Sequence, residues 1–200
     1  FSRMADPWER QAYIKARHVA GDPEVGAALL ARAHHFVYET EPDAELASKI
    51  QAMRQRMEVE RAGPAGKGAH VKLGSGGIVD IEFAVQYLQL RHGGEHRLLR
   101  TPNTLEALRG LGAAGFVPAE ESAALEESYR FLRRVENRLR IVADLSVNTL
   151  PSAPAKLEKL ARRMGYAPRP EAAAREQFLG DYAAHTGRVR AIYNRVLGQR

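Results

Sequence analysis

The segment GSGGIVDIEFAVQYLQLR, residues 74–91, decides the fold because its two acidic residues fit two incompatible structures. On a β-strand, alternate side chains share a face, so Asp80 and Glu82 would converge and could hold a metal ion for phosphoryl or nucleotidyl transfer. On an α-helix, each residue is rotated by ~100° from the previous one, so the two carboxylates point ~160° apart and cannot bind one ion.

The apolar residues of this segment favour the helix. They fall on two helical faces with a narrow polar stripe between them: Ile78, Ile81, Val85 and Leu88 on one face, Val79, Phe83 and Leu90 on the other, and Glu82, Gln86 and Gln89 in the stripe. The pattern continues for about fourteen residues, which is a common helix length and a rare strand length. We therefore predict a helix buried on two sides, with no metal ligand and no catalytic residue in it.

Two roles remain open for Glu82. Burying an unpaired carboxylate costs several kcal/mol, so Glu82 either pairs with Arg134 or Arg138 of the longest predicted helix or faces a shared cleft together with the two glutamines. We also expect one buried ion pair among Arg133, Arg134, Glu136 and Arg138, tying that long helix to the buried one.

Helix start and stop signals recur along the whole chain. Caps such as Asp22 and Asn103 open helices, and glycines such as Gly21 and Gly165 end them. The expected helices cover residues 6–20, 22–39, 43–62, 78–91, 103–115, 118–142, 157–164 and 178–196, with at most one short strand around 71–73. The predicted fold class is all-α, a helical bundle of about seven or eight helices with short connections.

The composition limits the functions open to the chain. It has 200 residues, no cysteine and a formal net charge of +6. The lack of cysteine excludes disulfides and thiolate metal sites and fits a cytoplasmic protein, and no apolar run approaches the ~20 residues of a membrane span. The positive charge raises the alternative of a basic nucleic-acid-binding helical bundle. Arginine and glutamate are interleaved along residues 126–140, however, which is typical of a solvated helix face.

A glycine-rich turn offers one candidate phosphate contact. Gly74, Gly76 and Gly77 precede the N-terminus of the predicted helix, where free N–H groups attract anions, and Lys72 lies just upstream. Their spacing matches neither a P-loop nor a dinucleotide-binding motif. Asp80, in the first turn, can interact with the same helix dipole.

Two further groups of residues are candidates for ligand contacts. Lys15 and Arg17 either reach a nucleotide phosphate in an intact enzyme or are ordinary surface charges. The histidines at 34–35 and at 92 and 96 are not expected to hold zinc, because adjacent helical residues diverge and a zinc site needs three or four ligands.

Five blocks of the sequence together resemble one family: WERQAYIKARHVAGD (8–22), VKLGSGGIVDIEFAVQYLQLRHGG (71–94), LRTPNTLEAL (99–108), SYRFLRRVENRLR (128–140) and NTLP (148–151). Their order and spacing resemble bacterial glutamine synthetase adenylyltransferase, also called glutamate-ammonia-ligase adenylyltransferase, over nearly the whole chain. The helical domain of PII uridylyltransferases is a weaker match.

The resemblance implies a multifunctional enzyme of nitrogen metabolism with two similar halves, each a nucleotidyltransferase domain followed by a helical bundle. One half transfers AMP from ATP to a tyrosine of glutamine synthetase with Mg²⁺, and the other removes the AMP by phosphorolysis. PII signal proteins and glutamine set the balance. Glutamine synthetase and PII are therefore the implied partners, and neither a membrane nor nucleic acid is expected.

The same resemblance implies a domain organisation. Residues 1–22 correspond to the C-terminal end of a nucleotidyltransferase domain, residues 23–70 to charged helices and a Gly-rich loop, and residues 71–200 to the PII-uridylyltransferase-like helical bundle. The family's Gly-Ser turn with a distant Asp-x-Asp would lie upstream, so the Gly-Ser and Asp-x-Glu of residues 74–82 are a look-alike. We expect the fragment alone to be inactive, with ATP and Mg²⁺ bound elsewhere in the intact enzyme. The block RVRAIYNRVLG (188–198) favours the adenylylating half.

Overall fold

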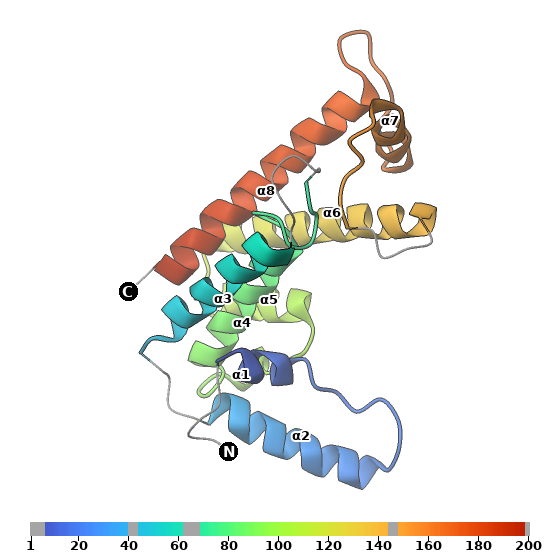
Figure 1. The fold of residues 1–200 in the computed structure, drawn as a ribbon. Helices are drawn as coiled ribbons and strands as arrows, with labels where there is room; N and C mark the ends of the chain where they lie inside the picture. The colour runs from blue at the N-terminus through green and yellow to red at the C-terminus, as the bar shows by residue number, and fades with distance from the viewer. Residues whose placement is uncertain (1–6, 40–43, 62–68, 144–147, 199–200) are drawn as a thin grey trace. The chain divides into compact units, whose positions relative to one another are not determined.

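The computed structural model describes residues 7–39, 44–61, 69–143 and 148–198, and these are mostly helical (Figure 1). The elements in chain order are α1 (Pro7–Ile14), α2 (Pro23–Tyr38), α3 (Leu46–Arg61), α4 (Ile78–His92), the 3₁₀-helix η1 (Arg97–Leu99), α5 (Thr104–Ala113), α6 (Ala119–Ala143), α7 (Pro154–Arg163) and α8 (Ala174–Gly198). Within these ranges there is no β-strand, and the expected strand at 71–73 is replaced by an isolated bridge between His70 and Thr149. The all-α prediction is confirmed.

The chain divides into two compact units. The first contains α1, α2, η1, α5 and parts of α3, α4 and α6. The second contains α7, nearly all of α8, most of α6 and the remaining parts of α3 and α4. The domain boundaries expected at residues 22 and 70 stay a prediction.

Helix α1 is shorter than predicted, because it ends at Ile14 and does not continue to Ala20. The N–H groups of Lys15 and Ala16 donate to carbonyls three residues earlier, which closes the last turn. Residues 17–20 are all exposed, so more helix would bury no apolar face there. The predicted cap at position 6 lies outside the described residues.

Helix α2 begins and ends as its capping residues predict. The Asp22 carboxylate accepts the N–H groups of Glu24 and Val25 at 2.8 and 3.2 Å, and proline occupies the first helical position. In the first unit α2 packs against α1, where Arg10 Nη2 donates to the Val37 carbonyl at 2.6 Å.

The remaining helix boundaries agree with the sequence to within a few residues. Asn103 caps α5 by accepting the N–H groups of the second and third helical residues at 3.0 and 3.3 Å. Helix α7 is followed by Gly165 at φ 99°, where the Tyr166 N–H donates to the Ala161 carbonyl at 3.1 Å. Helices α7 and α8 begin somewhat earlier than predicted, and the ends predicted for α3 at positions 43 and 62 lie outside the described residues.

Each unit has its own apolar core. In the first unit the most deeply buried side chains include Val37, Ile50, Leu99, Leu108 and Leu111. In the second they include Val71, Ile78, Leu132, Val135 and Phe178. None of the described helices has a stretch long and apolar enough to cross a lipid bilayer.

Candidate functional site

The acidic pair of the opening segment lies on α4, which confirms the helical alternative. Asp80 is completely buried, whereas Glu82 is partly exposed two residues further along the helix. Among the described residues no group of three or more His, Cys, Asp or Glu side chains is placed to hold a metal ion. The helix therefore separates the two carboxylates that a strand would have brought together.

Asp80 accepts hydrogen bonds from Gly76 and Arg190 within the second unit. Its Oδ2 accepts the Gly76 N–H at 2.8 Å and Nη1 of Arg190, on α8, at 3.0 Å. The same Arg190 nitrogen lies 3.2 Å from Glu58 Oε2 on α3, and the guanidinium lies over the Tyr193 ring at 5.3 Å. Asp80, Arg190 and Glu58 thus form an ionic cluster that joins three helices, and we call it the Asp80 cluster.

The Asp80 cluster stabilises the charged form of Arg190. Burial acts to lower the pKa of Arg190, but the hydrogen bond and charge of Asp80, with the charge of Glu58, outweigh it and raise that pKa above its usual value. The guanidinium stays charged and compensates a carboxylate that would be strongly destabilising alone. From the sequence, Asp80 was expected to interact with the helix dipole, and its pairing with Arg190 was not predicted. The one local indication of that pairing is that Arg190 follows Val189, which is buried on α8.

The glycine turn before α4 is filled by the protein's own backbone. Gly76 has φ 70°, and a Cβ there would collide with the Thr186 carbonyl, so no larger residue fits. The N–H groups of Ile78 and Val79 donate to the carbonyls of Val71 and Lys72 at 3.2 and 3.1 Å. The first N–H groups of α4 are therefore already paired, and the turn has a packing role that sequence reasoning did not include.

The nucleotide contacts proposed for this turn remain untested. Gly76 and Gly77 are buried, and Lys72 and Gly74 are half-buried. The Gly74 N–H donates to the His70 carbonyl at 2.7 Å. The nucleotide-facing role of Lys72 and the three glycines stays a prediction.

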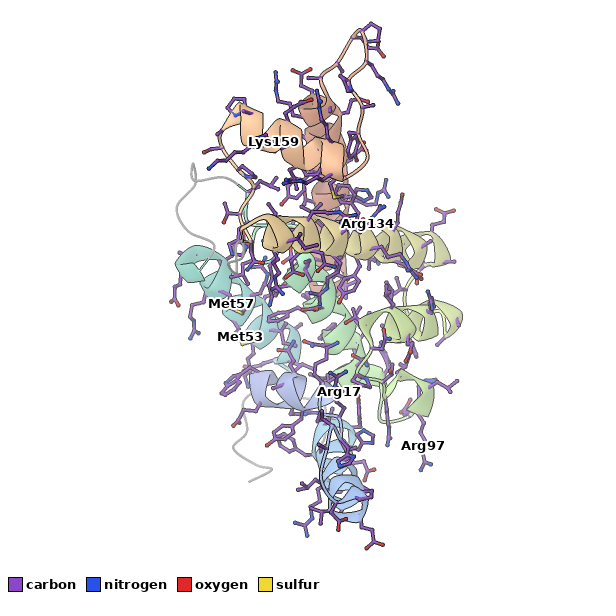
Figure 2. The ribbon with its side chains drawn as sticks, turned by 90° about the vertical axis from the view of Figure 1, so that its right-hand side faces the viewer. Arg17, Met53, Met57, Arg97, Arg134 and Lys159 are labelled. Carbon is purple, nitrogen blue, oxygen red and sulfur yellow. The ribbon has the colours of Figure 1, made fainter. Side chains whose placement is uncertain are left out.

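The other predicted cleft residues lie in the first unit. Lys15 Nζ donates at 2.8 Å both to the Pro102 carbonyl and to Thr104 Oγ1, at the start of α5. Arg17, labelled in Figure 2, is exposed in the segment after α1. Gln86 and Gln89 of the polar stripe are buried, and Gln89 Nε2 donates to the Leu99 and Thr101 carbonyls at 2.6 and 2.9 Å. The role of Glu82, like those of Lys15 and Arg17, stays a prediction.

The expected buried ion pair of α6 is present, but its partners lie on the same helix and do not tie α6 to α4. Glu136 is almost fully buried, and it pairs with Arg133 at 2.8 Å and Arg140 at 3.0 Å, both on the same helix. Residues three and four apart are neighbours on a helix surface, which explains this choice of partners. Arg134 and Arg138 are exposed and form no ion pair with any residue in the described ranges.

The histidines meet aromatic or acidic neighbours. His92 stacks on Phe116 with ring centroids 3.9 Å apart, and His96 meets the same ring edge-on at 4.9 Å. Burial, followed by the charge of Arg91, lowers the pKa of His92. His35 Nδ1 lies 2.7 Å from Glu39 Oε2.

The described residues form an all-α helical bundle. A model of the family described as GlnD PII-uridylyltransferase matches residues 44–197, and the chain belongs to this family.

Three curated relatives share one name, bifunctional glutamine synthetase adenylyltransferase/adenylyl-removing enzyme. The protein from Xanthobacter autotrophicus is 43% identical over 176 residues, which is 87% of this chain and 18% of the relative. The protein from Rhodopseudomonas palustris strain HaA2 is 37% identical over 198 residues, covering 98% of this chain and 19% of the relative. The protein from Streptomyces coelicolor is 39% identical over 165 residues, covering 82% and 16% respectively. The resemblance inferred from the five sequence blocks is confirmed, and the chain spans less than a fifth of each of these relatives.

Proposed function

We propose that this chain is a helical-bundle portion of a bifunctional enzyme that adenylylates glutamine synthetase and removes the AMP by phosphorolysis. The observation that carries the proposal is the 37–43% identity to relatives of that name over nearly the whole chain. The parent enzyme would use ATP and Mg²⁺, respond to a PII signal protein and work in the cytoplasm. Residues 1–22 would be the end of the preceding nucleotidyltransferase domain.

The described residues do not fit the role of an Mg²⁺ site for nucleotidyl transfer. Two-metal catalysis needs carboxylates that converge on the ion with open coordination positions. Asp80 is buried against Arg190, and Glu82 points in another direction on the same helix. We therefore assign no catalytic step to this chain. We propose that it forms one side of the nucleotide cleft in the intact enzyme and contacts protein partners.

The nucleic-acid alternative gains no support from the arrangement of charge. Several surface arginines pair with glutamates: Arg130 with Glu126 at 2.7 Å, Arg162 with Glu158 at 3.2 Å and Arg188 with Glu127 at 3.1 Å. Such pairs partly neutralise the basic residues that phosphate binding along a duplex would require.

A chimera tests the proposed function. The 200-residue chain would replace the matching region of the Xanthobacter autotrophicus relative, and incorporation of labelled AMP into glutamine synthetase would be measured. We expect the folded chimera to transfer AMP, and a version in which a Gly-Ser linker replaces the region to be inactive. The chain alone should transfer none. Transfer by the chain alone, or an inactive chimera whose circular dichroism is native-like, would contradict the proposal.

A further inference from the structure

A cavity in the second unit concentrates positive charge. It has a volume of about 590 Å³ and is lined by the C-terminal half of α6, the connection at 149–153 and α7. Its cationic lining residues are Arg138, Lys156, Lys159 and Arg163, and no aspartate or glutamate is among the lining residues that the structure describes. The volume is in the range of small-molecule sites, ~300–1,000 Å³.

The four cations have no counter-charge among the described residues. Each is exposed, and none forms an ion pair or side-chain hydrogen bond with another residue in the described part of the chain. Lys156, Lys159 and Arg163 recur at three- and four-residue steps, so they share one face of α7 (Figure 2 labels Lys159). Like charges at this spacing destabilise a helix, so the arrangement is unfavourable until an anion neutralises it.

Arg162, next to Arg163 on α7, has an acidic partner and does not line the cavity. Arg162 is absent from the cavity lining and is paired with Glu158, whose other carboxylate oxygen accepts the Arg175 N–H of α8 at 3.1 Å. The single acidic residue of α7 is therefore engaged away from the cavity. Two adjacent arginines of one helix thus differ in two respects: Arg163 lines the cavity without a described counter-charge, whereas Arg162 lies outside the lining and is paired with Glu158.

Two further features of the lining fit a compact, multiply charged ligand. Ala153, at the N-cap of α7, lines the cavity and supplies no side-chain hydrogen bond to the helix, so the positive end of the helix dipole adds to the four side-chain charges. Leu139 and Leu160 also line the cavity and offer an apolar surface beside the cations.

We propose that this cavity binds a small polyphosphate anion. A ligand that neutralises four cations around one cavity must carry several negative charges within a few ångströms. A triphosphate group carries three or more such charges in one compact unit. Lysine and arginine are both established phosphate ligands, arginine through its planar fork and lysine as a point charge. The four cations border one cavity, which favours a small molecule over a nucleic-acid strand that would need a charged groove along its length.

Calorimetric titration of the 200-residue chain tests the site, with ATP and inorganic tripolyphosphate as separate probes. The solutions contain no Mg²⁺ and about 50 mM NaCl, because phosphate contacts weaken steeply with salt. We expect one binding event, weakened about tenfold in Lys159→Gln and in Arg163→Gln. Arg162→Gln removes the same charge from the same helix and should change the affinity less than about twofold. Tighter binding of ATP identifies an organic phosphate that uses the leucines, whereas equal or tighter binding of tripolyphosphate identifies an inorganic one.

Three results would overturn the proposal. The first is no binding of either probe up to roughly 5 mM by a chain with native circular dichroism. The second is an equal loss of affinity in Arg162→Gln and Arg163→Gln, which would indicate diffuse charge attraction. The third is binding of an oligoglutamate peptide by a chain that ignores tripolyphosphate, which would assign the cavity to an acidic polypeptide. These titrations contain no glutamine synthetase, so their outcome does not depend on the AMP-transfer function proposed above. A failure of one proposal can therefore be distinguished from a failure of the other.

Discussion

Replacing Arg190 by methionine should destabilise the chain far more than the loss of a surface charge. Asp80 has no exposed surface, so the loss of Arg190 removes a charged donor from a carboxylate that stays buried. Breaking a buried ion pair on one side costs about 3–5 kcal/mol. The Arg190 side chain is 32% exposed and water can reach the vacated position, so we expect the lower end, about 3 kcal/mol. The Glu58 side chain is 26% exposed, so the loss of its contact with Arg190 adds little.

Urea unfolding and thermal melting followed by circular dichroism measure this effect. For a chain of this size, about 3 kcal/mol corresponds to a fall in Tm of roughly 6–12 °C. Arg188→Met is the matched control, because Arg188 lies on the same helix and pairs with Glu127 in solvent. Its cost should stay below about 1 kcal/mol.

A double variant separates the buried charge from lost packing. Asn at position 80 still accepts the Gly76 N–H but carries no charge, so Asp80→Asn combined with Arg190→Met should recover about half of the loss. The reasoning is refuted if Arg190→Met is no more damaging than Arg188→Met. It is also refuted if the double variant is no more stable than Arg190→Met alone.

Three further predictions concern other parts of the two units. Gly76→Ala should lose about 1–2 kcal/mol of stability because of its left-handed backbone, and about 1–3 kcal/mol more because the new Cβ overlaps the Thr186 carbonyl. Gly115→Ala, at φ 75° in open space, is the control and should lose only the first amount in thermal melts. Equal losses in the two variants would contradict the packing role of Gly76. Gln89→Leu removes the side-chain donor from the Thr101 carbonyl and leaves the Leu99 carbonyl with the Thr101 N–H, so we expect a loss of about 1–3 kcal/mol. Amide exchange in residues 97–101 should become faster, and unchanged exchange there would argue against this role. Burial lowers the pKa of the His185 imidazole in the folded chain relative to the unfolded chain. Below about pH 6.5, the usual histidine pKa, the unfolded chain therefore binds more protons than the folded chain. The free energy of unfolding should then fall as the pH decreases from about 6.5 towards the pKa of His185 in the folded chain. The urea midpoint of His185→Gln should be less sensitive to pH over this window, and an identical pH profile would refute the assignment.

The helical elements could be predicted because their signals are local. Asp22 and Asn103 reach N–H groups two and three residues away, so the sequence alone shows where α2 and α5 begin. The apolar spacing of residues 78–91 likewise identifies a helix buried on two sides, and this excludes a carboxylate pair on a strand. The end of α1 was predicted wrongly, since it depends on whether residues 17–20 find anything to pack against, and a repeating local pattern cannot show this.

The ion-pair partners could not be predicted in the same way. Helical spacing makes Arg133 and Arg140 the local partners of Glu136, but only the structure shows that Glu136 is buried and that this pairing does not join α6 to α4. The cationic cavity was missed for a similar reason. Arg138 and Lys159 look like solvated charges in the sequence, and only the fold shows that no described carboxylate neutralises them.

The sequence by itself determined the all-α class, the positions of most helices, the geometric separation of Asp80 from Glu82 and the family to which the chain belongs. These follow from spacings of a few residues and from blocks of similar sequence. Only the tertiary structure decided that Asp80 is paired with Arg190, that the glycine turn is closed by backbone, and that the cations of α6 and α7 share one cavity. The physical reason is that Asp80 and Arg190 are 110 residues apart in the chain, and charge pairing at that separation depends on how helices pack and not on any local periodicity.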